Sequence, residues 1–171
     1  MNKKILDIQY RPMTLDDLTQ VQALDREIFP DPWPSDAFHY ELVENNHSVC
    51  WIAEQNEPDD TKSIIGFVVV WLILDEAHIG TLAVKPLYKG HGIGRRLLAH
   101  ALLDSCTKGA EKSLLEVRAS NTDAQRLYFG MGYEVVGMRP AYYPDNHEDA
   151  LLLTLEKLNS EKLAVLASGK V

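Results

Sequence analysis

The residues best suited to chemistry form a glycine-rich stretch, LAVKPLYKGHGIGRRLL, over residues 82–98. Gly90, Gly92 and Gly94 alternate immediately before a helix-forming run. Glycine lets the backbone turn outward and lets a ligand approach closely. The first amide groups of a helix are free to bind an anion. The pattern therefore predicts a phosphate-binding cradle made of backbone, with a strand before it and a helix after it.

Two common phosphate motifs do not fit this loop. A P-loop needs a Lys-Ser/Thr pair after its last glycine, and none follows here. A dinucleotide-binding turn needs the spacing G-x-G-x-x-G, but Leu97 stands where a motif starting at Gly92 would place its third glycine. Two interpretations of the loop remain: it binds a different phosphate ligand, or it is an ordinary glycine turn before a helix.

A second stretch, LLEVRASNTDAQRLYFGMGYE over residues 114–134, offers a carboxylate and a phenol. A predicted strand carries Glu116, and the next predicted helix begins at Asn121 and carries Tyr128. A carboxylate can take a proton from an amine, and a phenol can give one to a leaving group. Both residues could instead have purely structural roles, with Glu116 on a solvated sheet face and Tyr128 in the core. Asn121 is typical of a helix N-cap.

These groups must be positioned by a mixture of strands and helices. Hydrophobic periodicity predicts seven strands, at 7–13, 47–55, 63–74, 77–84, 113–119, 133–139 and 150–155. It predicts four helices, at 15–29, 36–43, 93–108 and 121–131, with Thr14 and Ser35 as caps of the first two. Residues 56–62 form a polar turn, and the segment after Leu158 is polar with some helical character. This order favours one mixed sheet with helices on both faces.

Composition narrows the functional classes. The chain has 171 residues and a formal net charge of −8, which disfavours a nucleic-acid partner and suits a basic substrate. The longest apolar run is too short to span a bilayer, and MNKKILD contains no secretory signal, so we expect no membrane partner and a cytoplasmic location. Cys50 and Cys106 are expected to be reduced. We expect no metal site, and we expect His91 and His100 to be solvent-exposed.

The two stretches together resemble the GCN5-related N-acetyltransferase (GNAT) family. The loop is similar to the family's Q/R-x-x-G-x-G/A motif, with Lys89 at the Gln/Arg position. LDEAHIGTLAV, LLEVRASN, the LY of RLYFGMGY and RPAYYPDNHEDA resemble its ribosomal-protein-alanine N-acetyltransferase (RimI) branch. The resemblance implies an α/β GNAT fold, with a single mixed sheet of about seven strands flanked by about four helices. It places the domain at 1–158 and a C-terminal tail at 159–171.

The resemblance also implies the roles of individual residues. Glu116 matches the family's general base and Tyr128 its general acid. The positions that match its acetyl-CoA-binding residues are Leu82, Ala83, Val84, Lys89, Gly90, His91, Gly92, Ile93, Gly94, Arg95, Asn121 and Tyr128. Tyr142 and Tyr143 match a loop that lines the acceptor peptide. Phe29 and Trp33 lie where this fold shapes the acceptor site, although a hydrophobic staple is an equal alternative.

The function that the resemblance implies is direct transfer of acetyl from acetyl-CoA to the N-terminal α-amine of a basic protein or peptide. The acceptor in the RimI branch is the N-terminal alanine of a small-subunit ribosomal protein. Two alternatives share the cofactor loop: an acetyltransferase for a small amine such as a polyamine or drug, and a non-catalytic acyl-CoA-binding module.

Overall fold

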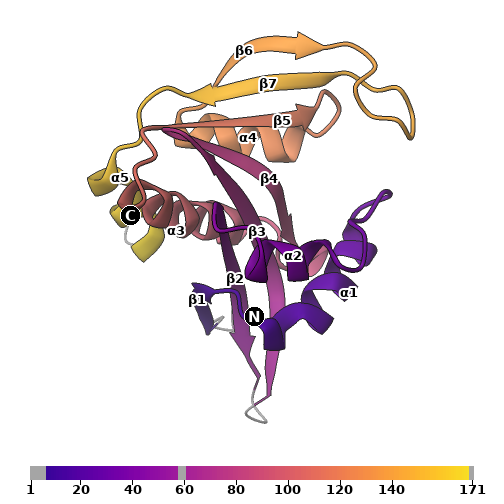
Figure 1. The fold of residues 1–171 in the computed structure, drawn as a ribbon, viewed down its shortest axis with the longest axis vertical. Coiled ribbons are helices and arrows are strands. Elements are labelled where there is room, and N and C mark those ends of the chain that lie inside the picture. Colours follow the sequence, from indigo (N-terminus) through magenta and orange to yellow (C-terminus); the bar gives the residue numbers. More distant parts are fainter. Residues whose placement is uncertain (1–6, 58–60, 170–171) are drawn as a thin grey trace, which may run out of the picture.

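Seven strands form one sheet in the order β1-β2-β3-β4-β5-β7-β6 in the computed structural model, which describes residues 7–57 and 61–169 (Figure 1). The strands are β1 Ile8–Pro12, β2 Ser48–Asn56, β3 Lys62–Ile73, β4 Glu76–Val84, β5 Lys112–Arg118, β6 Glu134–Arg139 and β7 Ala150–Leu155. β4 and β5 pair in parallel, and the other neighbours pair antiparallel. The predicted mixed sheet is confirmed.

The helices divide between the two faces of this sheet. α1 Leu18–Ile28 packs against β3 and β4, and α2 Ala37–Val43 packs against β2. On the other face lie α3 Ile93–Thr107, α4 Thr122–Met131 and α5 Ser160–Ser168. Two short 3-10 turns, Leu15–Asp17 and Pro86–Tyr88, precede α1 and α3. In the described ranges no helix is long and apolar enough to cross a membrane.

β3 is the centre of the core because both of its faces are covered. Residues 64–70 are all buried. Ile65, Val68 and Val70 join the cluster under α3, whereas Phe67 and Val69 join the cluster under α1 and α2. Period-2 alternation places successive side chains on opposite faces of a strand, so a continuous apolar run is what a doubly covered strand requires.

The first two helices begin differently from the prediction. The expected helix at 15–29 starts as a 3-10 turn, and regular α-helix begins at Leu18. Ser35 is not the cap of α2, because Asp36 occupies the N-cap position and makes no side-chain cap bond. Ser35 instead accepts a hydrogen bond from Gln22 on its backbone oxygen at 2.7 Å. In the expected turn at 56–62, residues 58–60 lie outside the described residues.

The segment expected as a tail contains α5, a helix beyond the four predicted. It runs antiparallel to α3, with Ser160 near Cys106, Ala167 near His100 and Gly169 near Arg96. Leu163 and Ala167 are buried in the α3 cluster. Two buried positions four residues apart give a narrow apolar stripe, which is a weak periodic signal.

His100 is not solvent-exposed, contrary to the prediction, whereas His91 is exposed. The His100 ring stacks between Tyr10 and Trp51, with both pairs of ring centroids 5.1 Å apart. Burial lowers the pKa of His100, although a backbone hydrogen bond with Ala167 opposes the shift. His100 therefore joins β1, β2, α3 and α5. Cys50 and Cys106 are free thiols, as predicted.

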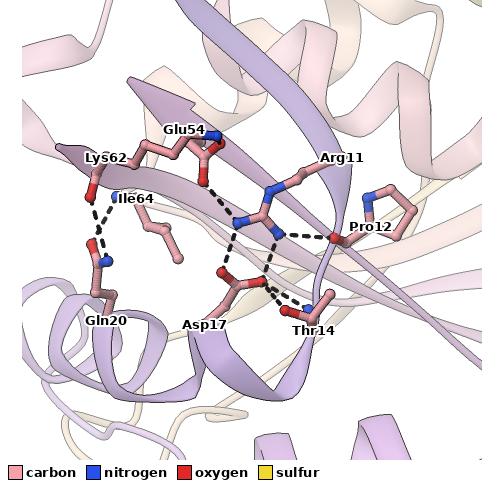
Figure 2. Close-up of polar contacts among 8 residues, drawn as sticks. All are labelled: Arg11, Pro12, Thr14, Asp17, Gln20, Glu54, Lys62 and Ile64. Carbon is pink, nitrogen blue, oxygen red and sulfur yellow. Dashed lines mark hydrogen bonds and ion pairs between the residues drawn. The ribbon is translucent and has the colours of Figure 1, made fainter. Parts of the chain in front are cut away.

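A partly buried ionic network joins the start of α1 to the sheet edge (Figure 2). Arg11 donates to both oxygens of Asp17 at 2.7 and 2.8 Å and to Glu54 at 2.7 Å. Lys62 pairs with the other Glu54 oxygen at 2.9 Å. Thr14 donates its backbone N–H to Asp17 at 2.8 Å, which closes the turn that leads into α1. The network therefore fixes where α1 leaves the sheet.

This network predicts acid-sensitive stability. Burial favours protonation of Asp17 and Glu54, but the hydrogen bonds and charges of their partners outweigh it and lower both pKa values. The network's stabilisation is therefore present above the ordinary carboxyl pKa and is lost as pH falls through the lowered values. Arg11→Met should lower the free energy of unfolding by about 3 kcal/mol at pH 7 and by less near pH 3.

Urea titrations from pH 7 to pH 3 measure this difference. Arg126→Met is a matched control, because Arg126 is 80% exposed in its pair with Asp123 and should change stability by under about 0.5 kcal/mol. An equal loss for Arg11→Met at both pH values would contradict the ionic account.

Candidate active site

β4 and β5 separate beside the glycine loop. Their paired register covers Glu76–His78 against Lys112–Leu114, and beyond it the two strands diverge (Figure 1). β4 also bulges against β3, where Gly80 falls between the paired residues Ile79 and Thr81. A bulge bends a strand and increases its local twist. The remainder of β4 therefore presents a backbone edge toward an opening in the sheet.

The closed end of this opening is held by a hydrogen-bonded chain. The Tyr133 hydroxyl donates to the Ser113 hydroxyl at 2.6 Å, and that hydroxyl donates to the backbone oxygen of Ala77 at 2.8 Å. Ala77 and Ser113 are directly opposed in the parallel register. Tyr133 and Ser113 are both buried. The sequence does not indicate these hydrogen bonds, because the three residues come from separate segments of the chain.

A cavity of about 510 Å³ occupies the opening, between β4, the glycine loop and α4. Its walls contain eleven of the twelve predicted cofactor residues: Leu82, Ala83, Val84, Lys89, Gly90, Gly92, Ile93, Gly94, Arg95, Asn121 and Tyr128. His91 is the exception, and its Nδ1 lies 3.0 Å from the backbone oxygen of Lys89. Further lining residues that the sequence did not indicate are Ile28, Tyr88, Asp123, Ala124, Arg126, Leu127 and Gly130.

The glycine loop has the backbone shape of an anion cradle. Gly90 and Gly92 have φ of 79° and 74°, and Gly92 is the N-cap of α3. These left-handed conformations favour glycine over residues with a Cβ. A Cβ at Gly94 would lie 2.9 Å from Leu127, so α4 packs directly against the start of α3. The first amide groups of α3 have no intrahelical acceptor and can face a phosphate.

These features fit acetyl-CoA. The backbone edge of β4 at Leu82–Val84 suits the amides of an extended pantetheine arm, as in strand addition to a sheet. The loop and the positive end of the α3 dipole suit the pyrophosphate. Acetyl-CoA supplies a thioester, and β4 would hold that thioester within the opening.

Tyr128 and Asn121 lie on α4, where the sequence predicted them. Asn121 is the N-cap and accepts the backbone N–H of Ala124 at 3.2 Å. Tyr128 is 7% exposed, contacts Tyr133 edge-on at 5.5 Å and lines the cavity. Burial raises the pKa of its phenol, and the charge of Tyr143 adds to the shift. Tyr128 is therefore a protonated phenol at neutral pH.

Glu116 lies on the opposite face of β5 from the α3 core. Leu115 and Val117 on either side of it are buried, and Glu116 is exposed. Its Oε1 pairs with Arg139 Nη1 of β6 at 3.2 Å, across β7. Arg139 also lies 5.6 Å from the centre of the Tyr142 ring. Glu116 does not line the cavity, so an acceptor would reach it from the face that carries α1 and α2.

Tyr142 and Tyr143 lie in the β6–β7 loop beside Glu116. Their rings contact edge-on at 5.1 Å, and Arg118 of β5 stacks 3.8 Å from the centre of the Tyr143 ring. Burial raises the pKa of Tyr143 to about 12 against the opposing charge of Arg118, and Glu116 is among the charges that raise it. Tyr143 is thus an electrostatic neighbour of both Glu116 and Tyr128.

Arg118 fixes the shape of this loop. It donates to Asp145 at 2.9 and 3.0 Å and to Glu148 at 3.4 Å. Glu148 also accepts the backbone N–H of Ser120 at 2.6 Å, and the Ser120 contact is the main cause that lowers its pKa to about 2. Asp149 accepts the backbone N–H of Ala141 at 2.8 Å. The acidic residues of the loop therefore hold its own backbone and Arg118.

Phe29 and Trp33 lie between α1 and α2, and the structure separates their roles. Phe29 lines the cavity. Trp33 does not; its ring stacks on Phe38 at 5.0 Å and on Trp71 at 5.9 Å. Trp33 therefore supports this wall of the opening from within. Among the described residues, no group of three His, Cys, Asp or Glu side chains could hold a metal ion.

A sheet that opens beside a glycine cradle, with a phenol and a carboxylate at its two faces, is an arrangement that suits an acyl-CoA-dependent acyltransferase. Residues 18–133 match the sequence model of the acetyltransferase (GNAT) family. The chain belongs to this family, and it is an acetyl-CoA-dependent N-acetyltransferase.

Named relatives are similar over most of the chain. The [ribosomal protein bS18]-alanine N-acetyltransferase of Salmonella typhimurium is 31% identical over 141 residues, which are 81% of this chain and 90% of the relative. A Bacillus subtilis protein that bears this name provisionally is 36% identical over 143 residues, 84% and 91% of the two chains.

Solved structures of N-acetyltransferases are similar to this chain over most of its length. The crystal structure of the Escherichia coli ribosomal-protein-S18-alanine N-acetyltransferase is similar with a TM-score of 0.76 and 29% identity, over 90% of this chain and 97% of that one. Arabidopsis thaliana NAA60 in complex with a bisubstrate analogue gives 0.78 and 25%, over 89% and 99%. The predicted fold is confirmed.

Proposed function

We propose that this protein transfers the acetyl group of acetyl-CoA to the N-terminal α-amine of a protein, and that its acceptor is the N-terminal alanine of a small-subunit ribosomal protein. The opening between β4 and β5, with the glycine cradle at one end and access to Glu116 from the other face, carries the proposal. The names of the relatives supply the acceptor. With a ribosomal acceptor, we propose a cytoplasmic location for the reaction.

We assign the proton transfers to two residues of this chain. Glu116 takes the proton of the attacking amine, directly or through a water, as the amine nitrogen bonds to the thioester carbon. Tyr128 gives its phenolic proton to the departing thiolate as the carbon–sulfur bond breaks. A backbone N–H of Leu82–Val84 donates to the thioester oxygen as negative charge develops there. Acetyl passes directly to the amine, so no residue of the enzyme is acylated.

An α-amine makes modest demands on the base. Its ordinary pKa is near 8, so exposing the neutral amine at pH 7 costs about 1 kcal/mol. A lysine side chain, with a pKa near 10.4, costs about 4–5 kcal/mol. A single exposed carboxylate such as Glu116 suffices to deprotonate an α-amine. This favours an N terminus over a lysine side chain as the acceptor.

The surface that would face the acceptor carries aromatic side chains, and the protein as a whole is acidic. Phe29 lines the cavity just after α1, and Tyr142 and Tyr143 lie in the β6–β7 loop beside Glu116. The net charge of −8 favours the approach of a basic N-terminal segment, as that of a ribosomal protein would be. Because Asp145, Glu148 and Asp149 already bind loop partners, we assign this attraction to the whole surface.

Acetylation of a panel of amines tests the proposal. Thiol release and product mass would be measured with an alanine-starting basic peptide, the same peptide with a blocked α-amine, and a polyamine. We expect one acetyl group on the free peptide and none on the blocked one. Turnover of the polyamine without turnover of any peptide would replace the proposal with a small-amine acetyltransferase. Tight acetyl-CoA binding without any turnover would indicate a binding module.

A further inference from the structure

The segment that joins α1 to α2 has few backbone donors. Residues 29–35 read FPDPWPS, with prolines at 30, 32 and 34. Proline has no backbone N–H. Between residues 29 and 34, only Phe29, Asp31 and Trp33 can therefore donate a backbone hydrogen bond. The conformation of this segment depends on what those few amides contact.

One residue accepts two of these three amides. The backbone oxygen of Asp25 accepts the N–H of Phe29 at 2.9 Å. The side-chain Oδ2 of Asp25 accepts the N–H of Trp33 at 2.7 Å. Asp25 lies in the last turn of α1 and is 1% exposed. It therefore holds both sides of the proline-rich turn from within the protein.

The Asp25 carboxyl is costly to bury. Its Oδ1 is buried without a hydrogen-bond partner in the described part of the chain. Burial raises the pKa of the Asp25 carboxyl, although the Trp33 amide and the charge of Arg26 oppose the shift. An apolar residue of similar volume would usually serve stability at least as well. The carboxyl's identifiable contribution is thus its bond to Trp33.

The Trp33 side chain connects this hydrogen bond to the opening through packed rings. Its ring is nearly parallel to that of Trp71, with an interplanar angle of 7°. Trp71 in turn covers Gly80, where an added Cβ would lie 2.9 Å from the indole. Gly80 is the bulge at which β4 leaves its regular register. The Asp25 anchor, the tryptophan pair and the opening thus form one continuous packed unit, with Phe29 on the cavity wall.

We propose that Asp25 is a positioning residue for the acceptor, which fixes the Phe29–Trp33 turn as the wall that receives the first residues of the peptide. The proposal rests on the proposed function, because it requires a peptide acceptor. Asp25 touches neither reacting group and acts through Phe29 and Trp33. Its loss should weaken acceptor binding and leave the acetyl-CoA cradle, on the other face, unchanged.

Steady-state kinetics with the alanine-starting peptide test this proposal. Asp25→Leu preserves volume and removes the acceptor atom, so we expect the peptide KM to rise tenfold or more. We expect kcat and the KM for acetyl-CoA to stay within about twofold. Asp25→Asn retains an oxygen for the Trp33 amide and should keep a peptide KM near that of the wild type. A rise equal to that of the leucine variant would overturn the proposal.

Asp17→Leu is the matched control, because Asp17 is also a buried carboxylate at the same helix and has purely structural contacts. It should lower the melting temperature without changing the peptide KM. If Asp25→Leu likewise lowers only the melting temperature, the positioning role is wrong and the proposed function stands. If the wild type acetylates no peptide, the proposed function is wrong.

Hydrogen exchange of the Trp33 amide tests the anchor independently of activity. In the wild type this amide should exchange at least a hundredfold more slowly than an exposed amide, and Asp25→Leu should remove most of that protection. Unprotected exchange in the wild type would overturn the proposal, even if the leucine variant does not fold. Full protection in the leucine variant would also overturn it.

Discussion

Tyr128→Phe should lower kcat by about a hundredfold or more and leave acetyl-CoA binding unchanged. The variant removes one hydroxyl from a buried ring that lines the cavity. General acids contribute about 10²–10⁴ to rate, and the phenyl ring keeps the packing against Tyr133. Stopped-flow thiol release and calorimetric binding of acetyl-CoA separate the two quantities.

The pH dependence of the wild type gives a second check on Tyr128. Burial holds its pKa above the ordinary tyrosine value near 10, and the acid form is the one that donates. Tyr128 should therefore remain able to donate its proton from pH 6 to pH 10. Any decline of kcat that the wild type shows within this range should persist in Tyr128→Phe.

Tyr133→Phe is the matched control. Tyr133 is equally buried, and its hydroxyl contacts Ser113 at the closed end of the opening. Its loss should cost about 1 kcal/mol of stability with kcat within about threefold. A Tyr128→Phe enzyme as fast as the Tyr133→Phe enzyme would remove the assigned acid role.

Glu116→Gln should lower kcat/KM for the peptide by about a hundredfold at pH 7. The defect should narrow as pH rises from 7 to 9, because the α-amine, with a pKa near 8, then loses its proton without help from a base. Stability should change by less than about 0.5 kcal/mol, since the carboxylate is partly exposed and its partner Arg139 is 55% exposed. Rates across this pH range measure the effect.

Glu134→Gln provides the comparison for Glu116, because it makes the same change on an exposed residue of β6. It should leave the pH–rate profile unchanged. A Glu116→Gln defect that is the same at pH 7 and pH 9 would indicate a role in shaping the acceptor site instead of accepting a proton.

The parts of the site that the sequence could predict are local. Gly90 and Gly92 have positive φ, and Asn121 caps the helix that carries Tyr128, because each depends on its immediate neighbours in the chain. Glu116 is exposed on β5 between the buried Leu115 and Val117, which agrees with the solvated sheet face that the sequence offered for it. The positions of the seven strands along the chain followed from apolar runs whose length and flanking turns identify them.

What the sequence could not predict depends on partners distant in the chain. Arg139 reaches Glu116 across β7, and Arg118 shapes a loop that lies 27–30 residues away. Asp25 reads as one more polar residue of α1 until the fold places the Trp33 amide beside it. His100 looked exposed because nothing local indicates that Tyr10 and Trp51 enclose it.

The position of the acetyl group on a peptide that offers two amines tests the central claim most directly. The peptide would begin with alanine, carry one internal lysine, and be analysed by tandem mass spectrometry after incubation with the enzyme and acetyl-CoA. We predict a single acetyl group on the N-terminal fragment ions, with the lysine unmodified. Acetyl on the lysine with a free N terminus would contradict α-amine transfer.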